Sequence, residues 1–146
     1  MQTIAEDRSV AGTSLSSTTS TRSVRAGRLL SSLAVLFLVT DSAGKLLQVQ
    51  PVIDQTLQLG YPRQVVFTLG AILLSCVIAY VVPRTSVLGA VLLTGYLGGA
   101  VATHVRAESP LFSHVLFPIY LAALLWLGLM LRDARLRAFL PMRRRS

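Results

Sequence analysis

Long apolar segments alternate with short polar ones along most of the chain. The apolar segments cover residues 29–49, 64–82, 86–105 and 113–131. Each is about 20 residues long, and an α-helix of that length rises about 30 Å, the thickness of the hydrocarbon core of a bilayer. The pattern therefore predicts an all-α fold in which four transmembrane helices form an antiparallel bundle.

The polar segments predict how these helices connect. Only Pro83, Arg84 and Thr85 separate the second helix from the third, so these two must form an antiparallel hairpin. Residues 51–63 are expected to form a loop containing a Leu59-Gly60-Tyr61-Pro62 turn, because Gly permits positive φ and Pro cannot continue a helix. In the fourth helix, Pro118 predicts a bend.

The two ends of the chain differ from the expected membrane domain at residues 26–138. Residues 1–25 are rich in Ser and Thr and carry few large apolar groups, which favours a disordered cytoplasmic tail. Residues 139–146 form a basic cytoplasmic tail suited to anionic lipid head groups. A signal peptide is the competing interpretation of the basic start of the first helix, but Asp41 falls where cleavage needs a small residue. We therefore expect the helix to be retained.

Composition and charge support a membrane protein. The chain is 53% apolar and 14% charged, against about 25% charged in ordinary soluble domains. Its net charge of +8 is confined mainly to one expected side of the membrane. Eleven of the 14 basic residues lie in that group: Arg8, Arg22, Arg25, Arg28, Arg84, Arg132, Arg135, Arg137, Arg143, Arg144 and Arg145. This distribution predicts a lipid bilayer as partner, both termini in the cytoplasm, and no nucleic-acid surface.

Small residues mark the third helix as the expected centre of the bundle. Gly95, Gly98, Gly99 and Ala102 form overlapping GxxxG-like pairs. Small residues let membrane helices approach closely, where packing replaces the hydrophobic drive that lipid cancels. These four residues are therefore predicted to pack helices together.

Asp41 and Lys45 place opposite charges four residues apart in the first helix. A single ionised group near mid-membrane costs roughly 2.5–3.5 kcal/mol on insertion scales, and acid preceding base at this spacing favours an ion pair. The pair is expected to face into the bundle. The alternative is that Lys45 extends to the membrane surface with Asp41 neutralised beside it.

Further polar residues gather at the same expected outer face. Together with Asp41 and Lys45, the candidate polar pocket comprises Tyr96, Thr103, His104, Arg106 and His114. Two histidines at the ends of adjacent helices can serve a zinc site with Glu108, haem ligation or a proton-linked quinone site. The preferred interpretation is that both are hydrogen-bonded interfacial histidines with no ligand.

Catalytic patterns are absent from the sequence. It contains no nucleophile–base set, phosphate loop or metal-binding motif, so no enzyme is predicted; the cofactor is left open, with quinone as one candidate. Cys76 is the single cysteine, which excludes an internal disulfide, a CxxC pair and a thiolate zinc site. A small buried residue is the expected role for Cys76, with an intermolecular role left open.

Several motifs resemble the DoxX-like family. They are Lys45-Leu46, the Leu59-Gly60-Tyr61-Pro62 turn, Pro83-Arg84, and Gly95-Tyr96-Leu97-Gly98-Gly99-Ala100 followed by His104. The resemblance spans residues 27–138 and implies a four-helix protein of the bacterial inner membrane. Relatives include a small membrane subunit of a thiosulfate:quinone oxidoreductase and proteins linked to redox-stress complexes.

Two functional hypotheses follow. The first is a non-catalytic membrane subunit or partner of a redox system, quinone- or thiol-linked, with the candidate polar pocket open to the outer side. The second is a small transporter or a channel-like homo-oligomer that lines a path with Asp41, Lys45 and Tyr96. An enzyme acting alone ranks third.

Overall fold

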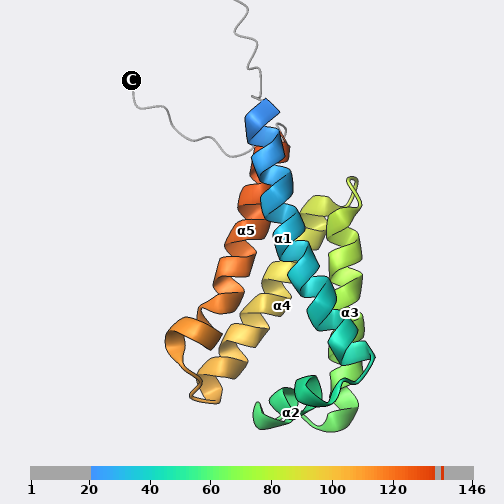
Figure 1. Ribbon diagram of the computed structural model, residues 1–146, viewed down its shortest axis with the longest axis vertical. Coiled ribbons are helices and arrows are strands. Elements are labelled where there is room, and N and C mark those ends of the chain that lie inside the picture. Colours follow the sequence, from blue (N-terminus) through green and yellow to red (C-terminus); the bar gives the residue numbers. More distant parts are fainter. Residues whose placement is uncertain (1–20, 134–135, 137–146) are drawn as a thin grey trace, which may run out of the picture.

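A computed structural model describes residues 21–133 and 136, and within them the chain is a helical bundle without strands (Figure 1). The elements are α1 (Thr21–Leu46), α2 (Gln50–Gln58), α3 (Arg63–Val81), α4 (Ser86–Arg106), the π-helix η1 (Leu111–Val115) and α5 (Phe117–Arg132). Four segments are long and apolar enough to cross a membrane: Arg22–Leu46, Arg63–Val81, Ser86–Arg106 and Leu111–Arg132. The predicted all-α bundle with four spans is confirmed.

Helix boundaries differ from the predicted ones in three places. The first helix begins at Thr21 rather than at residue 29, so residues 21–25 of the predicted tail are helical. The rest of that tail and residues 139–146 lie outside the described part of the chain. The predicted loop at 51–63 contains a helix, α2, which starts with Pro51 in its first turn. The fourth span is broken at Leu116, between η1 and α5, close to the bend predicted at Pro118.

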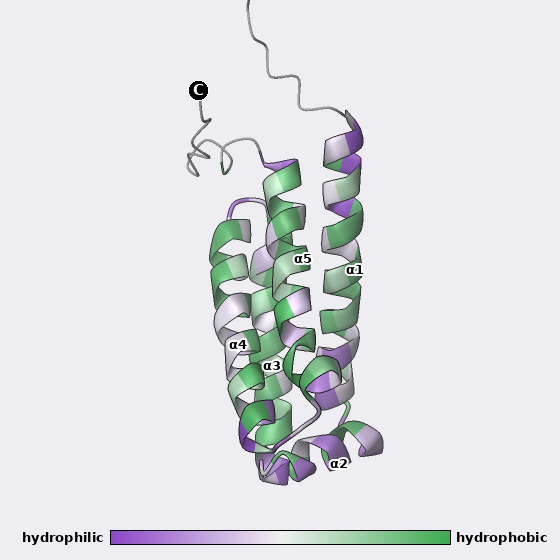
Figure 2. Cartoon of the chain, turned by 90° about the vertical axis from the view of Figure 1, so that its left-hand side faces the viewer, coloured by the Kyte–Doolittle hydropathy of each residue, from purple (hydrophilic) through white to green (hydrophobic). Residues whose placement is uncertain are grey.

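The four long helices occupy the corners of the bundle. α1 packs against α3 and α5, and α4 packs against the same two helices, whereas the described backbones of α1 and α4 do not touch. Figure 2 shows α5 between them, hydrophobic colour along the long helices, and hydrophilic colour on much of α2. α2 lies across one end of the bundle (Figure 1).

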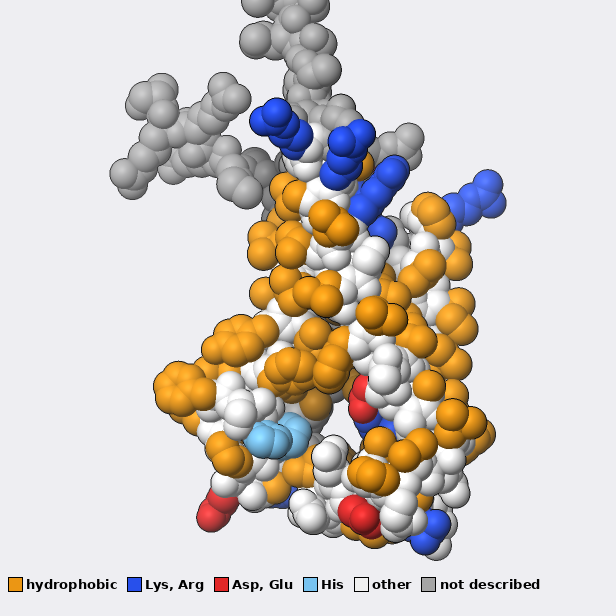
Figure 3. All heavy atoms as spheres, viewed as in Figure 1, with side chains coloured by type: hydrophobic (Ala, Val, Ile, Leu, Met, Phe, Trp, Pro, Cys, Tyr) orange, Lys and Arg blue, Asp and Glu red, His pale blue; other side chains and the backbone are white. Residues whose placement is uncertain are grey.

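The two ends of the bundle carry different polar groups. We call one the arginine end; it carries Arg22, Arg25, Arg28, Arg84 and Arg132. We call the other the histidine end; it carries α2, His104 and His114. Basic side chains gather at the first end and the histidines lie toward the second in Figure 3.

Four glycines of the described chain bring the long helices together, and all four lie outside the stripe predicted in α4. A Cβ added to Gly89 would clash with the Tyr80 backbone, where α4 crosses α3. One added to Gly70 would lie 2.7 Å from the Cβ of Lys45, where α3 crosses α1. Gly27 and Gly128 meet in the same way where α1 crosses α5. At these points only glycine lets the two backbones approach so closely.

The predicted glycine stripe of α4 faces away from the other helices. A Cβ on Gly95, Gly98 or Gly99 would meet nothing within 4 Å, and Ala102 is exposed. Within the single chain, therefore, α4 is not the innermost helix, and packing through this stripe is not used. The prediction could not distinguish the two faces because small residues occur on both.

Tyr80 is the polar centre of the arginine half of the core. Its side chain is fully buried, and its hydroxyl donates to the carbonyl oxygen of Leu125 at 2.9 Å. Since that proton is used, the Ser31 hydroxyl at 2.9 Å must donate to the Tyr80 oxygen. These bonds join α3 to α5 and α1 inside an apolar cluster that also holds Cys76, which is buried as expected.

Candidate functional site

The ion pair predicted in the first helix is present in α1. The Nζ atom of Lys45 lies 2.5 Å from Oδ1 of Asp41, one helical turn away. The Lys45 side chain is 13% exposed and that of Asp41 32%. Because Lys45 packs beside Gly70, seven residues into α3, the pair lies about 10 Å inside the helical layer. Pairing compensates both charges at a depth where a lone charge would be costly.

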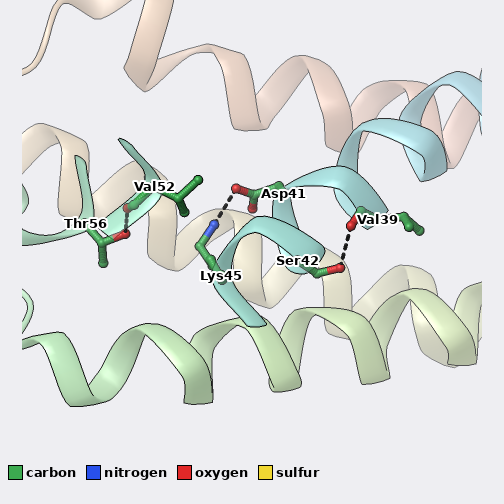
Figure 4. Close-up of polar contacts among 6 residues, drawn as sticks. All are labelled: Val39, Asp41, Ser42, Lys45, Val52 and Thr56. Carbon is green, nitrogen blue, oxygen red and sulfur yellow. Dashed lines mark hydrogen bonds and ion pairs between the residues drawn. The ribbon is translucent and has the colours of Figure 1, made fainter. Parts of the chain in front are cut away.

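α2 covers the end of the bundle next to this pair. Ile53 and Thr56 of α2 are buried, and a Cβ on Gly44 of α1 would touch Val52. The exposed side of α2 carries a hydrogen bond from Gln50 to Asp54. Figure 4 shows Val52 and Thr56 on the far side of Lys45 from the bulk of α1. The amphipathic α2 thus separates Lys45 from the water at the histidine end.

Thr103 and Arg106 hold the turn that follows α2. The Thr103 hydroxyl donates to the Gly99 carbonyl at 2.9 Å, so the Tyr61 hydroxyl must donate to Thr103 at 2.8 Å. Arg106 donates from Nη2 to the carbonyl of Leu59 at 3.3 Å. Gly60, which lies between Leu59 and Tyr61, has a φ of +86°, and a residue with a side chain would disfavour that conformation. Both predicted site residues therefore position the turn against α4.

The two histidines come together although they lie on different elements. His104 is on α4 and His114 on η1, and their ring centroids are 5.7 Å apart. His104 Nδ1 lies 3.2 Å from the Ser109 hydroxyl, and His114 Nδ1 lies 2.7 Å from the Ser113 hydroxyl. Among the described residues no hydrogen bond uses Nε2 of either ring. Each histidine thus has one nitrogen oriented by a serine and one nitrogen free for a ligand.

Tyr96 lies between the apolar core and the polar residues. It packs against the core cluster and is partly exposed. No hydrogen bond within the described part of the chain uses its hydroxyl. Tyr96 therefore keeps a free hydroxyl donor on α4.

Between α1 and α4 the histidine half of the molecule is hollowed. Figure 3 shows this hollow with the histidines on one wall and acidic and basic side chains on the facing wall. It arises because α1 and α4 occupy opposite corners and their described backbones do not touch. Nearer the arginine end, leucine side chains such as Leu38 and Leu93 are fully buried and close the core. Polar groups from α1, α4 and η1 therefore surround one space.

The structure separates the predicted residues into two groups. Asp41 pairs with Lys45, and His104 meets His114, while Tyr96 packs against the apolar core. Thr103 and Arg106 instead anchor the turn. Sequence reasoning missed the contributions of Tyr61, Ser109, Ser113 and α2. The amphipathic pattern of Gln50–Gln58, with Pro51 at its start, was the signal that could have identified the extra helix.

A third metal ligand does not join the histidines in the described structure. No group of three or more His, Cys, Asp or Glu side chains there is close enough to hold a metal ion. Glu108, the third ligand considered from the sequence, is exposed and has a φ of +51° in the turn after α4. The site instead offers a hydrogen-bonding surface: free imidazole nitrogens, a tyrosine hydroxyl and an ion pair.

The sequence model of the DoxX-like family matches residues 29–128, which include all four predicted spans except the last few residues of the fourth. No curated protein and no solved structure matches the chain.

Proposed function

The chain belongs to the DoxX-like family, and from this premise we propose that it is a non-catalytic membrane subunit or partner of a quinone- or thiol-linked redox system. In this proposal the protein lies in a bacterial inner membrane with its arginine end in the cytoplasm. The excess of arginine at that end supports the orientation, because basic residues favour the cytoplasmic side. The histidine end then faces outward.

The hollow between α1 and α4 is the observation that carries the redox proposal. A quinone needs donors for its carbonyl oxygens and apolar contact for its ring. The site offers both, since two imidazoles with free Nε2 atoms lie 5.7 Å apart and Tyr96 packs on the apolar core. Cys76 lies in that core cluster, which contains neither histidine. The arrangement therefore supports binding of a carrier rather than catalysis by the chain itself.

Affinity purification from membranes tests this proposal directly. The purified protein is expected to bring a redox protein with it and to bind a short-chain quinone in a fluorescence titration. His104→Ala should weaken quinone binding by about tenfold, the loss of roughly one hydrogen bond to a buried polar group. Ser75→Ala is the matched control, because Ser75 is exposed and bonds only to the Ala71 carbonyl. No redox partner and no quinone binding would overturn the proposal.

Proton-coupled transport is the second candidate, and the Asp41–Lys45 pair favours it. This pair is the intramembrane ion pair of the described structure, and its carboxylate is part-exposed. Ionisable residues inside membrane bundles often mark ion or proton paths. In liposomes, Asp41→Asn should abolish proton-coupled solute flux if the protein is a transporter. Flux that is absent from the wild type, with quinone binding present, would instead select the redox function.

A further inference from the structure

A second polar site lies at the arginine end, among α1, α3 and α5. A groove of about 280 Å³ is present there, lined by Arg28, Ser31, Ser32, Val35, Tyr80, Val81 and Arg132. It is slightly smaller than the ~300–1,000 Å³ typical of sites for drug-sized ligands. Its size therefore suits the head of a molecule whose remainder lies outside the groove.

The groove contains two cations without a carboxylate partner. Neither Arg28 nor Arg132 forms an ion pair with any described acidic side chain. Arg132 lies over the Tyr80 ring, with 5.0 Å between the guanidinium carbon and the ring centroid. Tyr80 is held by its bonds to Ser31 and Leu125. The guanidinium of Arg132 is thus positioned by a fixed ring, and its N–H groups are free to bind an anion.

Ser32 adds a free hydroxyl to these cations. By contrast, the exposed Thr40 and Ser75 bond back to their own helices, at the carbonyl oxygens of Leu36 and Ala71. Ser32 is exposed on α1 and makes no such bond in the described structure. A hydroxyl facing a membrane needs a partner, because lipid tails cannot supply one. Because Ser32 lines the groove, its hydroxyl adds a donor beside the two arginines.

We propose that the groove binds the phosphodiester of an anionic phospholipid. Arg28 and Arg132 hold the phosphate oxygens, since guanidinium groups match phosphate geometry with paired hydrogen bonds. Ser32 donates to a remaining oxygen. Val35, which lies farther from the arginine end on α1 than Arg28 and Ser32, contacts the first part of an acyl chain. The position at one end of the spans matches the depth of lipid head groups, and basic pockets between helices bind such lipids.

Lipid binding to delipidated protein in detergent tests the site. Native mass spectrometry with added phosphatidylglycerol should show retained lipid on the wild type and about tenfold less on Arg28→Gln, which removes one charge-assisted contact. Ser32→Ala should give a smaller loss. Arg84→Gln is the matched control, because it removes the same charge at the same end but lies outside the groove. Unchanged helical circular dichroism verifies that the variants are folded.

Three results would overturn this assignment. Equal losses in Arg84→Gln and Arg28→Gln would show that overall charge, rather than the groove, attracts lipid. Equal retention of phosphatidylcholine would show that the net anionic charge is not recognised. Displacement of the lipid by millimolar inorganic phosphate would make a free anion the ligand. None of these measurements depends on the quinone site at the other end.

Discussion

The two halves of the bundle differ in packing although the same four helices build both. In the arginine half, Tyr80 is fully buried and its hydroxyl serves two hydrogen bonds. In the histidine half, Tyr96 is half-buried beside a hollow and its hydroxyl has no described partner. Glycine crossings at Gly27, Gly89 and Gly128 hold the arginine half together. The closely packed arginine half holds the four helices in position. The histidine half can therefore keep polar side chains around the hollow between α1 and α4.

The largest expected effect comes from a glycine of the packed half. Gly89→Ala places a Cβ against the Tyr80 backbone and should lower the free energy of unfolding by about 3 kcal/mol through overpacking. Gly95→Ala is the matched control on the same helix, because its Cβ meets nothing within 4 Å. It should be neutral or stabilising by up to ~1 kcal/mol. Detergent unfolding followed by Trp126 fluorescence measures both.

If Gly95→Ala is less stable than the wild type, Gly95 cannot be unpacked as it is in the single chain. The exposed stripe of α4 would then be packed against another molecule in the membrane. Chemical cross-linking of the wild type would report such an assembly as a dimer or a larger species.

The second prediction compares the two tyrosines. Tyr80→Phe leaves the Ser31 hydroxyl and the Leu125 carbonyl without their partner and should cost about 2 kcal/mol of unfolding free energy. Tyr96→Phe removes a hydroxyl that makes no described hydrogen bond, so stability should change by less than ~0.5 kcal/mol. Thermal unfolding compares stability, and the quinone titration should be weakened only by Tyr96→Phe. Equal stability losses would mean that the two halves are packed alike.

The smallest effect is expected for the ion pair of the open half. Asp41→Leu leaves Lys45 unpaired at 13% exposure and should cost about 1–2 kcal/mol, less than for a fully buried pair because Asp41 is part-exposed. Asp41→Leu combined with Lys45→Leu should recover most of that loss, since no lone charge remains. Asp54→Asn on the exposed side of α2 is the control and should be neutral. Chemical denaturation of the purified variants measures all three.

The double variant also tests whether the pair has a function. If it is neutral for stability but abolishes the cellular phenotype of the protein, the pair serves a functional site. If the phenotype and the protein level are unchanged in the double variant, both the redox and the transport proposals lose the role given to Asp41 and Lys45.

Hydropathy along the chain was enough to predict four spans and their approximate limits, because hydrocarbon thickness imposes a length on every spanning helix. Local spacing was enough to predict the Asp41–Lys45 pair, since residues four apart in a helix are neighbours. Pro83 marked the end of the second span and Pro118 a bend in the fourth for the same local reason, because proline disrupts a helix. Each of these features depends on residues close together in the sequence.

Helix rotation could not be predicted, because a membrane helix is apolar on both its core face and its lipid face. The stripe at Gly95, Gly98 and Gly99 looked like a packing face, yet Gly70 and Gly89 are the residues at which backbones meet. The meeting of His104 with His114, and of Tyr61 with Thr103, likewise required the third dimension. The sequence alone thus determined which segments are helices, where the charges lie and which charges pair along one helix. Only the tertiary structure decided which helix faces touch. It also decided that α1 and α4 stand apart around a polar hollow. Both outcomes depend on how the apolar surfaces of four helices fit together, which no single segment of the sequence specifies.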